Sequence, residues 1–419
     1  MNTFQPLYKP VRSLLSGLLL LLCPAIAQAE DAAEALSGPD ATPNVLASDA
    51  AEKPDILNVN IQERFDTFKK ALKQKTGLDF GIDYNALGYV ASASLGKYNT
   101  GSGSLRFLGT WDLFDRNGPN KGGLVFKFEH RHAYSKVAPT AFNADIGYAG
   151  LVSSVFSDQK WRTTHLYWQQ NFAGGRGVAY AGFLDVTDYT DVYALASPWT
   201  GFSNLAFQTG SGTIGGLPDG AFGGMVGGFL TSNIYASASI ADANADATDI
   251  GSGFETFFND FETFKTVEVG WTSGPERLFI DNFHATFWQI DARSKAATPD
   301  GYGVSFSATK GINDRWLPFV RGGWSHDGGS LYQAALSVGF GYQRLPGRDL
   351  LGVGLNWSRP NQNTFGTKLD DQLTLEVFQR LQVTEGLQVT PSIQVIKDPA
   401  LNPNKDLIGL LGLRARMAL

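Results

Sequence analysis

The sequence has little of several residue types, and each shortage disfavours a class of protein. Among 419 residues there are one cysteine and three methionines, and only 18% of the residues are charged. A mean hydropathy of -0.12 does not fit a protein built from transmembrane helices. Glycine, with 48 residues, and aromatic side chains, at 12%, are abundant instead. This composition disfavours a helical bundle and favours many turns and half-buried strands.

The only cysteine lies in a segment that we expect to be removed. Lys9 and Arg12 precede an apolar run at 14–22, and a small-x-small motif ends at Ala29. This order is typical of a secretory signal peptide, here residues 1–29. The run is shorter than the roughly 20 residues that span a bilayer, which disfavours an uncleaved anchor. Cleavage removes Cys23, so the mature chain would contain no disulfide and no cysteine-bound metal.

Two segments precede the rest of the chain. Residues 30–55 are rich in Ala, Asp, Pro and Ser without periodicity, which predicts a flexible periplasmic linker. In residues 56–77, apolar side chains recur at helical spacing, lysines crowd the last turns, and Gly77 follows as a stop signal. We expect one amphipathic helix on the periplasmic side that packs against its own domain. A coiled-coil assembly device would need more heptads.

From Leu78 onward the apolar period changes from 3.6 to 2. In residues 301–310, for example, Tyr302 and Phe306 share one face while Ser305 and Ser307 share the other. The segments are about ten residues long, the length of a tilted strand that crosses a bilayer. Many of their polar faces are ionic, so the apolar faces cannot all meet in one packed core. An inverted barrel, apolar toward lipid and polar toward water inside, resolves this conflict.

The connections support an all-β chain, with residues 78–419 forming a 16-stranded antiparallel transmembrane β-barrel. Short turns alternate with longer connections near 134–160, 186–220 and 243–261, as periplasmic turns and external loops do in outer-membrane proteins. An even strand number returns both ends of the barrel to the periplasm. The expected strands lie near 78–93, 103–114, 123–133, 162–173, 178–186, 221–231, 234–242, 262–272, 278–291, 301–310, 316–327, 331–343, 350–359, 371–383, 387–397 and 406–419.

The last expected strand, 406–419, has one apolar face that continues to Leu419, whereas Arg414 and Arg416 lie on the other face. We expect this strand to pair with the first one, because bare backbone polar groups are very costly in lipid. Its apolar face resembles the signal by which the barrel assembly machinery recognises outer-membrane proteins. Most such proteins end in Phe, whereas this sequence ends in Leu.

Several stretches resemble the carbohydrate-selective porins of the OprB type. They are "GVGLNWSRPN" at 352–361, the closing segment 373–416 with "LTLEVFQRLQVTEGLQVTPS", and "FVRGGWSHDGG" at 319–329. The helix that leads into "GLDFGIDY" is also similar. The resemblance implies a sixteen-stranded channel of the Gram-negative outer membrane that takes up sugars passively. Family members line their constriction with inward arginines and acids, and the matching positions here are Arg321, Glu376, Arg380 and Arg414.

Strand parity predicts which charged side chains face the lumen. The pore-lining candidates are Arg106, Lys127, Glu129, Arg131, Glu268, Arg321, Glu376, Arg380 and Arg414, with Arg416 near the periplasmic end. Such groups can offer charge-assisted hydrogen bonds to sugar hydroxyls, although each could also be a solvated wall residue. We expect Glu376 and Arg380 to be unpaired and to face the permeant. Tyr167, Trp199 and Trp288 are candidate stacking faces.

The predicted partners are small carbohydrates and outer-membrane lipid, with a possible homo-oligomer and no cofactor or metal. The formal charge moves from -6 to about -8 when the signal peptide leaves, because two bases and no acid are lost. This acidity disfavours nucleic acid as a partner.

Other functions remain open at this stage. The basic wall would also suit a porin for anions or acidic solutes, and a closed lumen would make a structural barrel. We do not expect an enzyme. "GSGTIG" at 210–215 lacks the strand–helix context of a dinucleotide site, and His130 and His132 fall on the lipid-facing parity. His165 and His284 are inward, and they would be needed by a barrel lipase, the weak enzymatic alternative.

Overall fold

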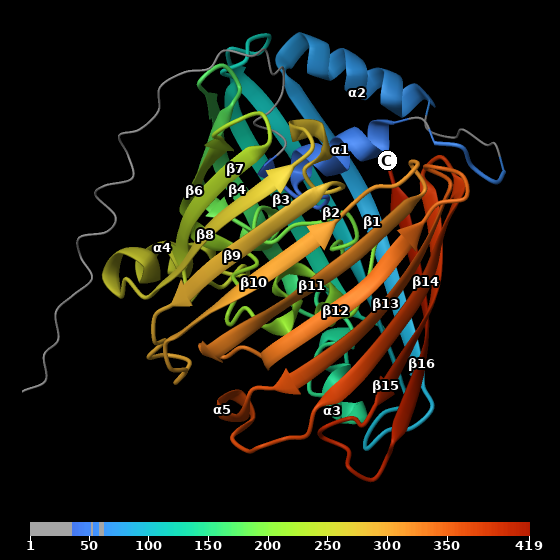
Figure 1. The fold of residues 1–419 in the computed structure, drawn as a ribbon. Coiled ribbons are helices and arrows are strands. Elements are labelled where there is room, and N and C mark those ends of the chain that lie inside the picture. Colours follow the sequence, from blue (N-terminus) through green and yellow to red (C-terminus); the bar gives the residue numbers. More distant parts are fainter. Residues whose placement is uncertain (1–35, 52, 58–62) are drawn as a thin grey trace, which may run out of the picture.

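Sixteen antiparallel strands close into one barrel in the computed structural model, which describes residues 36–51, 53–57 and 63–419 (Figure 1). The predicted signal peptide, 1–29, lies outside the described residues. The strands are β1 (Leu78–Ala91), β2 (Asn99–Phe114), β3 (Gly122–Ala133), β4 (Lys160–Phe172), β5 (Gly177–Leu184), β6 (Ala221–Phe229), β7 (Ile234–Asp242), β8 (Thr263–Thr272), β9 (Asn282–Ile290), β10 (Gly301–Thr309), β11 (Trp316–Asp327), β12 (Tyr332–Tyr342), β13 (Asp349–Pro360), β14 (Gln372–Thr384), β15 (Leu387–Lys397) and β16 (Leu407–Ala418).

Closure occurs between the first and last strands. β1 pairs with β16 from Asp83 opposite Ala418 to Ala91 opposite Leu410, so neither strand leaves an open edge. This confirms the expected pairing of the last strand. All sixteen predicted strands are present, with the largest shifts at the starts of β2 and β9. Residues 275–277, in the predicted short turn, form a 3-10 helix that ends on Leu278 with right-handed helical backbone, so β9 begins at Asn282 rather than at the predicted residue 278.

The distribution of side chains is inverted relative to a soluble protein. On β10, Tyr302 and Phe306 are 50% and 41% exposed, whereas Ser305 and Ser307 are buried. The same alternation continues on β9, where Phe283 and Phe287 are exposed and His284 and Thr286 are buried. The exposed apolar faces form the outer wall, as expected for a barrel surrounded by lipid.

The helices lie at the barrel ends and in the loops. They are α1 (Thr42–Ala50), α2 (Glu63–Thr76), α3 (Phe142–Ile146), α4 (Ile250–Asn259) and α5 (Gln362–Phe365). No helix among the described residues is long and apolar enough to cross a membrane. In Figure 1, α2 lies across the end of the barrel where the carboxyl terminus is found, and α4 projects outside the wall.

The structure narrows the predicted helix 56–77 to α2, which begins at residue 63. Residues 56 and 57 are exposed and not helical, and 58–62 lie outside the described residues. At its other end the helix stops before Gly77, whose φ of 78° is a left-handed conformation that favours glycine. The Lys73 ammonium of α2 lies 2.8 Å from the Asp79 carboxylate of β1, so the helix is tied to the barrel that follows it.

The prediction of a flexible linker at 30–55 is wrong for residues 36–51, which we call the amino-terminal segment. It contains α1 and lies inside the barrel, where Leu36, Val45 and Leu46 are all buried. Leu46 and Val45 pack against Leu108, an inward side chain of β2. The polar composition concealed this arrangement because only a few apolar side chains are needed when polar partners line a lumen.

The longer connections gather at the barrel end opposite α2. One of them, residues 185–220, enters the barrel, and Figure 1 shows this green segment inside the wall. We call it the inward loop. Its contacts with the inward strand residues Glu376 and Arg321 show that it occupies the lumen.

Candidate functional site

Asp191 anchors the first part of the inward loop. Its carboxylate lies 2.6 Å from the Arg321 Nη2 of β11 and 2.8 Å from the His284 Nε2 of β9. It also accepts a 2.6 Å hydrogen bond from the Gly210 backbone N–H, which joins two parts of the loop. The guanidinium of Arg321 stacks 4.0 Å above the ring of Tyr193. A buried arginine is therefore neutralised by the loop rather than by the barrel wall.

Glu376 of β14 anchors the middle of the loop. Its carboxylate accepts hydrogen bonds from the Ser203 N–H at 2.9 Å, the Ser203 hydroxyl at 2.8 Å and the Asn204 N–H at 2.9 Å. Close by, Arg414 of β16 donates to the carbonyl oxygens of Pro198 and Gly201, both at 2.8 Å. An acid thus binds loop donors, and a base binds loop acceptors.

Three cavities follow one another between the inward loop and the wall. The outer cavity, about 510 Å³, opens at the long-loop end, and the middle cavity of about 370 Å³ shares Arg131, Ser154 and Asp219 with it. The inner cavity, about 260 Å³, lies toward the short turns. Pro39, Asp40 and Trp199 line both the middle and the inner cavity. We call these three residues the divider.

The middle and inner cavities carry opposite charge. Five acids and two bases line the middle cavity: Asp40, Glu129, Asp185, Asp188, Asp219, Lys127 and Arg131. Four bases and two acids line the inner one: Lys53, Arg106, Arg380, Arg416, Asp40 and Asp49. A permeating molecule therefore meets an acidic chamber and a basic chamber in series.

The nine predicted pore-lining residues fall into two groups. Five line the cavities: Arg106, Lys127, Glu129, Arg131 and Arg380. Most of these are paired with other charges. The Arg106 Nε donates to the Asp83 carboxylate at 2.7 Å. The Lys127 ammonium lies 3.5 Å from the Asp188 carboxylate. The Arg131 Nη2 lies 2.6 Å from the Glu129 carboxylate. Arg380 donates to the Thr200 carbonyl at 3.1 Å.

The other four residues line none of the three cavities, contrary to the expectation that they line the pore. Glu268, Arg321, Glu376 and Arg414 point inward as parity predicts, but the inward loop covers them and uses them as anchors. The expectation that Glu376 is unpaired is likewise wrong, because three loop groups bind it. Parity gives the direction of a side chain and says nothing about what lies over it.

Among the aromatic and histidine candidates, some line a cavity and others do not. Trp199 belongs to the divider, and the Arg106 guanidinium lies 4.3 Å from its ring centroid. Tyr167 and Trp288 are buried in an apolar cluster and line none of the three cavities. His130 packs against Trp161, which is 64% exposed on the outer wall. Both ring nitrogens of His284 are engaged, one by Asp191 and the other by Asn282, which leaves no free nitrogen for a lipase base.

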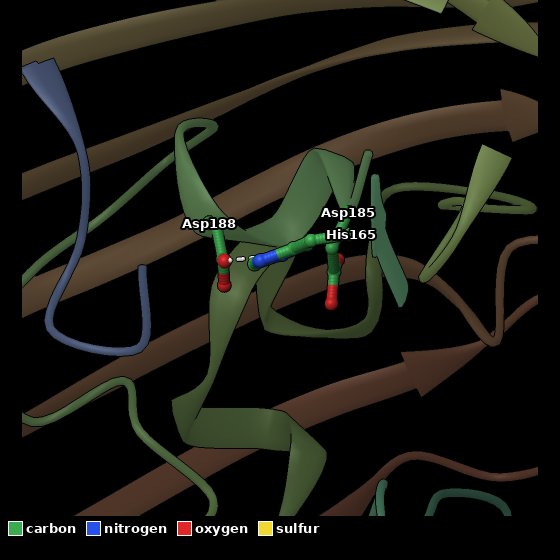
Figure 2. A group of neighbouring side chains, drawn as sticks. All are labelled: His165, Asp185 and Asp188. Atoms are coloured by element: carbon green, nitrogen blue, oxygen red, sulfur yellow. Dashed lines mark ion pairs between the residues drawn. The ribbon is translucent and has the colours of Figure 1, made fainter. Parts of the chain in front are cut away.

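One cluster has the composition of a metal site. His165 of β4 lies beside Asp185 and Asp188 of the inward loop, with one potential ligand atom from each within 4.8 Å of the others (Figure 2). The His165 Nε2 is 2.8 Å from Asp188, and its Nδ1 is 2.9 Å from the Thr42 hydroxyl. The Lys127 ammonium forms an ion pair with Asp188, and the Asp185 carboxylate accepts two hydrogen bonds from Thr187. These contacts join the barrel wall, the inward loop and the amino-terminal segment, so the cluster has a structural role that requires no metal ion.

Sequence reasoning missed the acids of the inward loop. Asp185, Asp188 and Asp191 recur every third residue in "DVTDYTD", and Asp188 and Asp191 each neutralise an inward base of the wall. This spacing just after an expected strand was a usable signal. Asp40 and Asp49 were missed because they lie in the supposed linker.

The acids of the middle cavity predict a pH-dependent ion preference. Burial raises the pKa of Asp40 to about 6, and the Asp188 charge adds to this effect, whereas Arg106 and Lys127 oppose it. Burial and the charge of Asp188 raise the pKa of Asp185 to about 7. Both carboxyls are neutral at low pH and ionise as the pH rises, so the cavity gains negative charge between about pH 5 and 8.

We therefore expect cation preference to increase over this pH range in planar-bilayer reversal potentials. Asp40→Asn should remove the part of the change in ion preference near pH 6, and Asp185→Asn should remove the part near pH 7. A wild-type profile that stays flat from pH 5 to 8 would show that neither carboxyl lies on the ion path.

Comparisons with known proteins agree with this geometry. The sequence profile of the carbohydrate-selective porin family, OprB family, matches residues 281–419, which confirms the resemblance over the carboxyl-terminal third of the chain. No curated protein matches the sequence. The structure of Pseudomonas putida OprB at high pH superposes with a TM-score of 0.69 at 16% identity, covering 85% of this chain and 97% of that chain.

Two further solved structures share the fold. The outer-membrane channel DcaP of Acinetobacter baumannii gives a TM-score of 0.50 at 11% identity, with 82% of this chain and 97% of that chain covered. A variant of the Rhodopseudomonas blastica porin gives 0.50 at 11%, with 82% and 100% covered. The profile match and the fold support an outer-membrane channel rather than an enzyme.

Proposed function

We propose that this protein is an outer-membrane porin through which small uncharged carbohydrates diffuse passively. The observation that carries the proposal is the pair of oppositely charged cavities in series inside a closed barrel. An anion is disfavoured in the acidic middle cavity and a cation in the basic inner one, so an ion of either sign meets one unfavourable chamber. An uncharged solute meets neither barrier.

A polyhydroxylated solute also finds suitable partners in both chambers. Carboxylates accept hydrogen bonds from sugar hydroxyls, and guanidinium groups donate to them, so the lost hydration is replaced on each side of the divider. Exit remains easy because the contacts are divided over several weak sites rather than concentrated in one. Trp199, whose ring is in contact with Arg106, adds an apolar surface at the boundary that the middle and inner cavities share.

One feature favours the alternative, a channel for acidic solutes. Arg380 lines the inner cavity, and among the described residues no carboxylate forms an ion pair with it. A carboxylate of a passing solute could bind there. The acidic middle cavity, through which such a solute must also pass, argues against this alternative as the main function.

The discriminating experiment is liposome swelling with neutral and acidic sugars of matched size, followed by current block in planar bilayers. We expect faster swelling with neutral sugars than with acidic sugars, and current reduction by a neutral sugar. Strong chloride selectivity and block by sugar acids would favour the alternative instead. Swelling no faster than in protein-free liposomes would remove the channel function altogether.

Arg380 can be tested in the same assay. Arg380→Ala should weaken sugar block by about 1.5–3 kcal/mol, the range for a hydrogen bond to a charged group. Arg344→Ala is the matched control, because Arg344 is exposed in a turn at the same end of the barrel and lies outside the three cavities. Equal block constants in wild type and both variants would remove Arg380 from the sugar path.

A further inference from the structure

The amino-terminal segment, residues 36–51, joins the inward loop at the point where the lumen is divided. The Gly38 N–H donates a 2.6 Å hydrogen bond to the Asp188 carbonyl, and the Ser197 hydroxyl lies 2.5 Å from the Asp40 carboxylate. A Cβ at Gly38 would stand 2.8 Å from Val192 Cγ1, so only glycine allows this close approach to the loop. The two chain segments thus meet in a fitted contact.

The same segment is also attached to the barrel wall at both of its ends. Toward its start, the Thr42 hydroxyl lies 2.9 Å from His165 Nδ1 of β4. Toward its end, the Asp49 carboxylate receives Arg416 of β16 at 2.6 and 2.8 Å. In the closed barrel β4 and β16 are separated by β3, β2 and β1, and α1 contacts all three of these strands, so the segment runs across the inner face of this part of the wall rather than along one strand.

This position makes the segment part of the permeation path. Pro39 and Asp40 supply two of the three divider residues, and only Trp199 comes from the inward loop. Farther along, Ser48 is exposed and lines the inner cavity. A constriction built by the inward loop alone would lack this side.

We propose that residues 36–51 form a fixed second half of the constriction, and that they determine the largest solute that passes. The inference rests on the proposed channel function. The segment narrows the lumen at the divider, lines the inner cavity with α1, and stays docked while solutes diffuse past it. The predicted cleavage after Ala29 leaves the segment in the mature chain.

The first test replaces residues 36–51 by a glycine–serine stretch of equal length. Single-channel conductance should rise severalfold, and liposome swelling should extend to larger oligosaccharides that the wild type excludes. Unchanged conductance together with an unchanged size limit would overturn the proposal. A wild type without any channel activity would instead refute the proposed function, so the two failures are distinguishable.

A second test does not depend on the replacement variant folding. The predicted mature chain has no cysteine, so Ser48→Cys can be labelled selectively with a bulky thiol reagent. Labelling should reduce the current strongly because Ser48 lines the inner cavity. Ser232→Cys is the matched control, since Ser232 is exposed in the turn between β6 and β7 and lies outside the three cavities. Complete labelling of Ser48→Cys, verified by mass, without loss of current would contradict the proposal.

Discussion

Replacing Glu376 by alanine should release the inward loop and widen the channel. The Glu376 carboxylate is 1% exposed and accepts three hydrogen bonds from Ser203 and Asn204. Its loss leaves two buried backbone N–H groups without an acceptor, each at a cost of about 1–3 kcal/mol, whereas the Ser203 hydroxyl retains its contact with the Tyr89 hydroxyl. The loop can regain those hydrogen bonds by moving into water, so we expect a marked rise in single-channel conductance and weaker sugar block.

The conservative variant Glu376→Gln tests whether conductance changes in proportion to the hydrogen bonds that are lost. Glu376→Gln keeps one carbonyl oxygen in place and should give an intermediate conductance. Glu255→Gln on the exposed face of α4 controls for the loss of a negative charge anywhere on the protein and should leave conductance unchanged. Protease cleavage within residues 196–208 should increase in the order wild type, Gln variant, Ala variant. Wild-type conductance in Glu376→Ala would show that other anchors hold the loop.

Replacing Asp191 by alanine should give the largest loss of stability. Asp191 pairs with Arg321, whose side chain is fully buried, and it also holds His284 and the Gly210 N–H. Removing one partner of a buried pair costs about 3–5 kcal/mol, because the remaining charge stays desolvated. We therefore expect the barrel in detergent to unfold at a lower temperature, measured by circular dichroism or by heat-dependent gel mobility.

A second substitution separates the ion pair from general disruption. Combining Asp191→Leu with Arg321→Met removes both charges and should recover part of the lost stability, because no buried charge remains. Asp370→Asn, in an exposed external connection, is the control and should unfold like the wild type. If the double variant is less stable than Asp191→Ala by a further several kcal/mol, packing rather than charge dominates this site.

Much of the barrel was predictable because its rules are local. A strand that separates lipid from water must alternate apolar and polar side chains, and residues 301–310 and 387–397 each show this alternation along a single strand. The strand number, the alternation of short turns and long loops, and the inward direction of Arg106, Lys127 and Arg380 follow from the same periodicity. The closing pair of β1 and β16 follows from the cost of an open edge in lipid.

The interior of the barrel was decided only by tertiary structure. Glu376 and Arg414 obey the parity that predicted a wall facing water, yet they serve as loop anchors. Glu376 meets Ser203 across 173 residues of sequence, and Asp49 meets Arg416 across 367. No periodicity marks such partners, because a loop that fills a lumen has no repeating environment. Its path is set by individual ion pairs and hydrogen bonds, which form only once the barrel has closed and brought the groups together.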